Sequence, residues 1–308
     1  MEFVLQIGLL IIGFVLLIKG ADIFVDGSSG IAVKFGIPQL VIGLTIVAMG
    51  TSSPEAAVSI SAALKGSAEI TIGNIVGSNI LNILIILGIS SVIVPLAVAK
   101  STMRYEIPFM IVITVLLLVT GLNGSIGIVE GIILLAAFAV YLTYLFIMAK
   151  NDMKQEDSPK DISTVKAALF IILGLAMIVL GSNFTVDAAS AIALSLGLSE
   201  RFIGLTIVAL GTSLPELCTS VSAARKGNAD IAIGNIVGSN IFNILFIVGL
   251  SALITEVPFA SNFIFDTIIA AAAAVMLLIG CLWEKGKLKR SAGILMLIGY
   301  AVYFAVIL

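Results

Sequence analysis

Two glutamates, Glu55 and Glu216, hold the same place in two copies of a short polar motif, Gly-Thr-Ser-x-Pro-Glu, at residues 50–55 and 211–216. Each lies about halfway along an apolar stretch. An ionisable group near a bilayer centre costs ~2.5–3.5 kcal/mol to insert, so it indicates a functional site. Two carboxylates that share one site must bind cations or protons, because like charges at close range do not both stay ionised unpaired. The alternative, protonated glutamates that only bridge helices, does not explain why the acid recurs at matching depth.

Hydroxyl and amide groups accompany both glutamates. In the first copy they belong to Thr51, Ser52, Ser78 and Asn82, and in the second to Thr212, Ser213, Ser239 and Asn243. Hard cations such as Ca²⁺ take six to eight oxygen ligands, and Na⁺ is also hard. Soft transition metals call for thiolate or imidazole, but the chain has no histidine and its two cysteines form no motif. Each Ser or Thr alone could equally bond back to its own helix; the complete set predicts a site for a hard cation.

Pro54 and Pro215 are expected to add backbone oxygens to this set. A proline inside a helix removes a hydrogen-bond donor and clashes with the carbonyl four residues earlier. The carbonyls of Ala48–Thr51 and Ala209–Thr212 should therefore be free to accept a cation. Broken helices are tolerated in membranes only where they are buried or line a cavity. A simple packing kink is the alternative, and it would leave the adjacent Thr-Ser pair and Glu unexplained.

Apolar helices must position these groups. Of the 308 residues, 60% are hydrophobic and 11% are charged, against about 45–50% and about 25% in soluble proteins. A spanning helix needs roughly 20 apolar residues, and the hydropathy pattern predicts an all-α polytopic membrane protein with ten such spans. They start near Phe3, Gln39, Ile70, Tyr105, Ile126, Val165, Glu200, Asp230, Asn262 and Ser291.

The distribution of positive charge orients these spans. Fourteen of the 16 Lys and Arg residues fall in odd-numbered connections, and only Lys65 and Arg201 do not. Because cytoplasmic loops carry the excess of Lys and Arg, we expect the odd connections in the cytoplasm and both termini outside. The most polar linker, residues 150–166, is then cytoplasmic and separates two five-helix units, 1–149 and 167–308.

An internal duplication relates the two units. Residues 41–90 and 202–251 align without a gap at an offset of 161, and 35 of the 50 aligned positions are identical. An odd number of spans per unit makes the repeats inverted, which is typical of secondary transporters with midplane sites, although some channels are also inverted duplications. We expect spans 2, 3, 7 and 8 to be broken helices. Gly73-x-x-x-Gly77 and Gly234-x-x-x-Gly238 should form close-packing faces, and the paired Asp26 and Asp187 suggest capping or gating.

The paired GTSxPE and GNIVGSN segments resemble the α-repeats of the calcium/cation antiporter superfamily, and prokaryotic Na⁺/Ca²⁺ exchangers above all. The resemblance implies exchange of Ca²⁺ against Na⁺ at sites between spans 2, 3, 7 and 8, with spans 1 and 6 sliding as a gate. It makes Glu55 and Glu216 the central Ca²⁺ ligands, shared with Na⁺. Thr51 and Thr212 would then lend carbonyl or hydroxyl oxygens.

The same resemblance implies flanking Na⁺ sites built from serine hydroxyls and two backbone carbonyls. Their members would be Ser52, Ser78, Ser213 and Ser239, with the carbonyls of Ala48 and Ala209. Asn82 and Asn243 would line the middle of the site. Several Na⁺/Ca²⁺ members carry Asp where this chain has Asn243, so the site here holds two formal negative charges, which still balance one Ca²⁺.

Other functions stay open at this point. Exchange of a proton against Ca²⁺ or another divalent cation is the nearest rival, because either glutamate could carry a proton; proton-coupled relatives tend to have Asn in place of the Thr-Ser pair. A cation channel would show flux uncoupled from any second ion. An intramembrane hydrolase is not favoured, because the sequence has no HExxH motif or Ser-His pair. We expect a monomer in the cell membrane, with no prosthetic group and no nucleic-acid partner.

Overall fold

The computed structural model describes residues 2–151, 163–197 and 209–307. Within these residues the fold is almost entirely helical. Eight helices are long and apolar enough to cross a bilayer, and a bent pair of helices makes a ninth span. The span expected to start near Glu200, together with Arg201, lies outside the described residues. The other nine predicted starts fall within three residues of the observed ones.

The first half begins with one long helix and ends with another. Its elements are α1 (Glu2–Phe35), α2 (Gln39–Ile42), η1 (Gly43–Val47), α3 (Ala48–Thr51), α4 (Ser53–Leu64), α5 (Glu69–Leu81), η2 (Asn82–Leu87), α6 (Gly88–Ile93), β1 (Leu96–Ala97), η3 (Thr102–Glu106), α7 (Ile107–Gly121), β2 (Ser125–Ile126) and α8 (Ile128–Asn151). The η segments are π-helical turns.

The second half repeats this order. Its described elements are α9 (Thr164–Ser195), α11 (Ala209–Thr212), α12 (Leu214–Arg225), α13 (Ala229–Phe242), η5 (Asn243–Val248), α14 (Gly249–Ile254), β3 (Val257–Pro258), α15 (Asn262–Trp283), β4 (Lys287–Leu288) and α16 (Arg290–Ile307). Two short antiparallel ribbons, β1 with β4 and β2 with β3, each join one half to the other.

The expected breaks occur in spans 2 and 7. The segments Gln39–Thr51 and Ser53–Leu64 are bent by 50° relative to each other. In both spans a single residue leaves the helical conformation two positions before the proline: Ser52 has φ −81° and ψ 8°, and Ser213 has φ −90° and ψ 1°. Each proline then lies in the first turn of the next helix, where its missing N–H costs nothing.

The prediction of broken helices for spans 3 and 8 was wrong. Glu69–Ile93 and Ala229–Ile254 are each one continuous span. Neither contains a proline to interrupt the hydrogen-bond ladder. Instead, each widens into a π-helical segment that begins at Asn82 or Asn243. These turns keep the chain helical, and such bulges often occur at functional sites.

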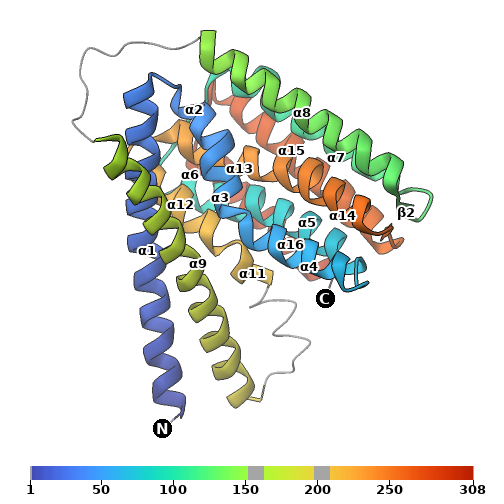
Figure 1. Ribbon diagram of the computed structural model, residues 1–308, viewed down its shortest axis with the longest axis horizontal. Coiled ribbons are helices and arrows are strands. Elements are labelled where there is room, and N and C mark those ends of the chain that lie inside the picture. The colour runs from blue at the N-terminus through green and yellow to red at the C-terminus, as the bar shows by residue number, and fades with distance from the viewer. Residues whose placement is uncertain (1, 152–162, 198–208, 308) are drawn as a thin grey trace.

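The long helices α1 and α9 run side by side at one edge of the molecule (Figure 1). Glycines spaced seven residues apart let their backbones touch. A Cβ on Gly13 would lie 2.9 Å from the Gly181 carbonyl oxygen, and one on Gly20 would lie 2.9 Å from that of Gly174. Gly174 and Gly181 are the counterparts of Gly13 and Gly20 at the offset of 161, so the repeat extends to these helices.

The spans that carry the polar motifs lie between α1/α9 and the α7, α8 and α15 helices on the opposite side (Figure 1). Gly234 and Gly238 place α13 directly against span 2: added Cβ atoms would lie 3.0 Å from the Leu40 carbonyl oxygen and 2.8 Å from the Leu44 Cα. The predicted close-packing face is therefore confirmed for span 8. It joins the second half to the first and brings the two motifs together.

Candidate cation-binding site

The two helix breaks aim both glutamates at the interior. Glu55 lies in the first turn of α4 and Glu216 in the first turn of α12. Their side chains are 1% and 0% exposed. A helix N-terminus carries partial positive charge, which favours a carboxylate in the first turn. The glutamates lie close enough for their charges to interact, as expected for one shared site.

Hydroxyl groups hold one oxygen of each carboxylate. The Ser52 hydroxyl donates to Glu216 Oε1 at 2.9 Å, across the two halves, and the Ser78 hydroxyl donates to Glu55 Oε1 at 3.4 Å. Thr212 also interacts with Glu55, and Thr51 with Glu216. Each glutamate thus contacts a hydroxyl of the other half.

Four carboxylate and amide oxygens of this site have no hydrogen-bond partner among the residues that the structure describes. They are Oε2 of Glu55, Oε2 of Glu216, Oδ1 of Asn82 and Oδ1 of Asn243, and all four are buried. An unpartnered buried polar group costs free energy, and an unpaired buried charge costs far more. The four atoms form two repeat-equivalent pairs and are all of the kind that hard cations bind.

The amides of Asn79 and Asn240 orient two of these oxygens. Asn82 Nδ2 donates to Asn240 Oδ1 at 2.9 Å, and Asn243 Nδ2 donates to Asn79 Oδ1 at 3.1 Å. The nitrogen of each amide is therefore engaged, and its oxygen is left for another partner. Asn79 and Asn240 also donate to each other's backbone carbonyls at 3.2 and 3.1 Å.

Asn74 and Asn235 brace the helices that carry the glutamates. Asn74 Nδ2 donates to the Glu55 carbonyl oxygen at 3.3 Å, and Asn235 Nδ2 donates to that of Glu216 at 3.4 Å. Asn235 Oδ1 also accepts a hydrogen bond from Thr51 at 3.0 Å. The sequence analysis assigned no role to these two asparagines or to Asn79 and Asn240, which are paired across the repeat. Their recurrence in the GNIVGSN segments was the signal.

The structure places most of the predicted site residues together. The Ala48 carbonyl oxygen accepts hydrogen bonds from the Thr51 and Ser239 hydroxyls, each at 3.3 Å, and from the Ser52 N–H at 3.0 Å. It therefore lies beside one of the predicted serines, but it is not the free carbonyl that was expected before Pro54. Ser213 is buried, and its hydroxyl has no partner among the described residues. Thr212 is half-buried. Ala209 begins α11, and the chain just before it lies outside the described residues.

Carboxylates alone cannot fill the coordination sphere of a metal ion at this site. Among the described residues, no group of three or more His, Cys, Asp and Glu side chains could hold one. Amide, hydroxyl and carbonyl oxygens would therefore have to complete it, as they can for Ca²⁺ or Na⁺. Such a site would balance the charge of an ion with two acids and complete its coordination with neutral oxygens.

Comparison with known proteins shows the family of this chain. The family described as "Sodium/calcium exchanger protein" matches residues 5–147 and 166–308. This chain belongs to that family. Family members exchange Na⁺ and Ca²⁺, so the chain is a membrane transporter of the exchanger class rather than an enzyme.

Individual relatives match along nearly their whole length. The chain is 40% identical to "Putative antiporter CaxA" from Alkalimonas amylolytica, covering 91% of this chain and 90% of the relative. It is 33% identical to "Sodium/calcium exchanger MaX1" from Methanosarcina acetivorans, covering 97% of each chain. A solved structure of the sodium-calcium exchanger NCX_Mj, soaked with Na⁺ and Ca²⁺, superposes with a TM-score of 0.85 at 34% identity, covering 98% of each chain. The fold is therefore that of this exchanger.

Proposed function

We propose that the protein exchanges Ca²⁺ for Na⁺ across the cell membrane by alternating access, with the ions bound by Glu55 and Glu216. The observation that carries this proposal is the set of four buried oxygens without a partner, two carboxylate and two amide, supplied equally by the two halves. Such an arrangement is costly unless a cation uses it. The names of the family and of MaX1 support the choice of Na⁺ and Ca²⁺.

Charge and ligand number fit one Ca²⁺ at the centre. Two carboxylates balance its double charge, and Asn82 and Asn243 add neutral oxygens. Thr51 and Thr212, which lie beside the glutamates, bring the number of nearby oxygens toward the six to eight that Ca²⁺ takes. Because both middle positions are Asn, the same two charges also balance two Na⁺.

Flanking positions suit Na⁺. On one side, the Ser239 hydroxyl and the Ala48 carbonyl oxygen lie 3.3 Å apart, so a small ion could bind both. The repeat-equivalent group on the other side comprises Ser78 and the carbonyl of Ala209, and Ser52 and Ser213 follow the motif threonines. Competition between the flanking and central sites for the two glutamates would couple Na⁺ binding to Ca²⁺ release.

Alternating access is supported by reciprocal contacts between the halves. Asn79 and Asn240, which are equivalent at the offset of 161, donate to each other's carbonyls. The ribbons β1–β4 and β2–β3 are likewise repeat counterparts. We propose two inverted five-helix repeats, 1–149 and 167–308, joined by a cytoplasmic linker at 150–166, with both termini outside and the monomer as the transporting unit.

Ca²⁺ uptake into proteoliposomes tests the proposal. Vesicles loaded with Na⁺ and diluted into Na⁺-free buffer with Ca²⁺ should accumulate Ca²⁺, and vesicles with Na⁺ on both sides should not. The double variant Glu55→Gln/Glu216→Gln is the control for leak. Uptake under a pH gradient alone would assign proton coupling instead, and Ca²⁺ flux without any second gradient would indicate a channel.

A further inference from the structure

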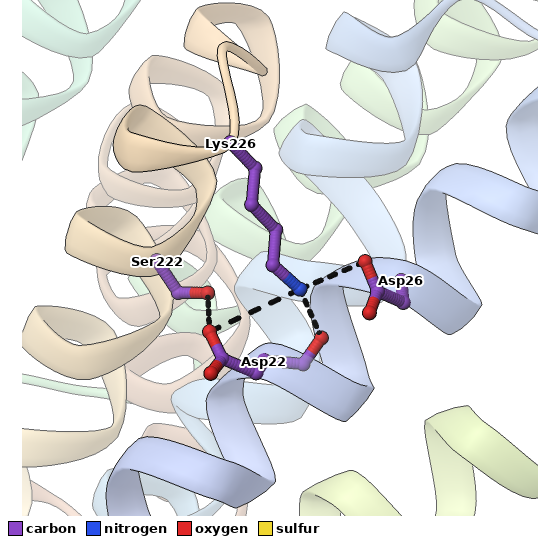
Figure 2. A network of polar contacts seen from close by, with 4 residues as sticks. All are labelled: Asp22, Asp26, Ser222 and Lys226. Atoms are coloured by element: carbon purple, nitrogen blue, oxygen red, sulfur yellow. Dashed lines mark hydrogen bonds and ion pairs between the residues drawn. The ribbon is translucent and has the colours of Figure 1, made fainter.

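A charged network ties the two halves together away from the cation site. Lys226, directly after α12, extends its ammonium group toward α1, where Asp22 and Asp26 lie one turn apart (Figure 2). Lys226 Nζ lies 2.7 Å from Asp26 Oδ1 and donates to the Asp22 carbonyl oxygen at 2.7 Å. It also lies 3.9 Å from Asp22 Oδ1, which accepts a hydrogen bond from Ser222 at 2.6 Å.

The repeat supplies a second set of the same residues. At the offset of 161, Lys226 corresponds to Lys65, Asp26 to Asp187 and Ser222 to Ser61. In the part of the chain that the structure describes, no ion pair joins Lys65 to Asp187, and both side chains are exposed. Helix α1 packs along α12, whereas the corresponding helices α9 and α4 show no comparable packing. The Lys226 contact therefore joins α1 to α12, and among the described residues the equivalent contact between α9 and α4 is not made.

The contact of Lys226 with Asp22 and Asp26 lies at the end of α12, the helix that carries Glu216. Ten residues separate Glu216 from Lys226, which is about 15 Å along a helix. A cavity of about 560 Å³ opens beside the network, lined by Asp22 and Lys226 and by apolar residues of α6 and α12. The contact between α1 and α12 therefore lies beside this cavity, at the end of the helix that leads to Glu216.

We propose that Lys226, Asp22, Asp26 and Ser222 form a latch that closes one side of the ion pathway, and that Lys65, Asp187 and Ser61 form the matching latch on the other side. In a transporter built from two similar halves, the alternate conformation exchanges the contacts that the halves make. Opening one latch therefore accompanies closing the other. This inference rests on the alternating access of the proposed function and adds the residues that hold each state.

The two latches differ in strength. Asp22 corresponds to Asn183, so the Lys65 latch offers its lysine one carboxylate where the Lys226 latch offers two. The state described here, with Lys226 engaged, is therefore favoured in the absence of ions. By the charge count along the sequence, the Lys226 end faces the cytoplasm, so this state is closed inward.

Distances between spin labels test the latch. In a variant with Cys218→Ala and Cys281→Ala, one label pair is placed at positions 34 and 225 and another at the repeat-equivalent positions 195 and 64, all four of which are exposed. Double electron–electron resonance in nanodiscs then measures the distance within each label pair, and this distance reports whether that side of the protein is closed. A partly exposed ion-pair network contributes about 1 kcal/mol, so Lys226→Met should lower the ratio of latched to unlatched molecules about fivefold at the 34/225 pair.

Matched variants make the test specific. Lys65→Met, the same substitution at the counterpart position, should shift the populations in the opposite direction or leave them unchanged. Asn183→Asp, which adds a contact rather than removing one, should shift them in the same direction as Lys226→Met. Unchanged distances in Lys226→Met and Asn183→Asp, with Na⁺-driven uptake intact, would overturn the latch alone. Absence of uptake by the unsubstituted protein would overturn the proposed function, whatever the distances show.

Discussion

Neutralising Glu216 should make the ion-free protein more stable and remove its response to Ca²⁺. Glu216 is fully buried, interacts with Glu55, and has one oxygen without a partner among the described residues. In Glu216→Gln the Ser52 hydrogen bond to Oε1 can remain, while the cost of keeping a second acid beside Glu55, either as a buried charge or as a carboxyl that must hold a proton, disappears. Removing an uncompensated buried charge is favourable, so the unfolding temperature of the ion-free protein should rise.

The size of the Ca²⁺ response follows from binding linkage. A ligand at 100 times its Kd stabilises the folded state by about 2.7 kcal/mol, and each kcal/mol raises Tm by about 2 °C in a protein larger than about 150 residues. The unsubstituted protein should therefore gain about 5 °C in saturating Ca²⁺, and Glu216→Gln should gain less than about 1 °C.

A thiol-reactive dye provides the assay. Cys218 and Cys281 lie within helices, half-buried and buried, so they react as the protein unfolds in detergent. Glu69→Gln, which removes a carboxylate at the exposed start of α5, is the matched control and should retain the full Ca²⁺ shift. The reasoning is refuted if Glu216→Gln is less stable than the unsubstituted protein without ions and still gains about 5 °C with Ca²⁺.

Three further substitutions test the site residue Asn243, the hydrogen bonds of Asn240 and the packing of α1 against α9. Asn243→Asp adds a third carboxylate and should change the affinity or preference for ions in uptake assays without unfolding the protein; unchanged affinity and preference would remove Asn243 from the inner site. Asn240→Ala removes the acceptor of the buried Asn82 amide and the side-chain donor to the Asn79 carbonyl oxygen. An unsatisfied buried group costs about 1–3 kcal/mol, so the midpoint of thermal unfolding should fall; an unaltered midpoint would show that these bonds do not hold the halves together. Gly20→Leu adds a side chain at a position where even a Cβ would lie 2.8 Å from Met177 Cβ. It should separate α1 from α9 and slow Na⁺-driven uptake, whereas Gly8→Leu, at a position with nothing within 4 Å, should not.

Local sequence signals were enough to predict nine of the ten helix starts, the tenth lying outside the described residues, and the breaks near Pro54 and Pro215, because hydropathy and proline act within one segment. They also placed Glu55 and Glu216 at equivalent depths. The continuity of spans 3 and 8 was missed, because polar residues in an apolar span do not by themselves break a helix. Both spans instead contain a π-helical segment that begins at Asn82 or Asn243.

The orientation of the asparagine amides could not be predicted from the motif. Asn79 accepts a hydrogen bond from Asn243, and Asn240 accepts one from Asn82, across the interface between the halves. That geometry arises only when distant segments pack. The contacts of Lys226 could not be predicted from the sequence either, because they also join distant segments. The repeat supplies an aspartate as a possible ion-pair partner for both lysines, Asp187 for Lys65 and Asp26 for Lys226. Only the packed structure shows that the Lys226 pair is the one that forms.

The location of bound Ca²⁺ tests the central claim most directly. A crystal soaked with Ca²⁺ and measured at a wavelength with anomalous signal should show one strong peak within about 2.3–2.6 Å of the Glu55 and Glu216 carboxylates. The same map should place the Asn82 and Asn243 side-chain oxygens around that peak. A Ca²⁺ peak bound to one glutamate only, or found elsewhere with both carboxylates free of ions, would contradict the account.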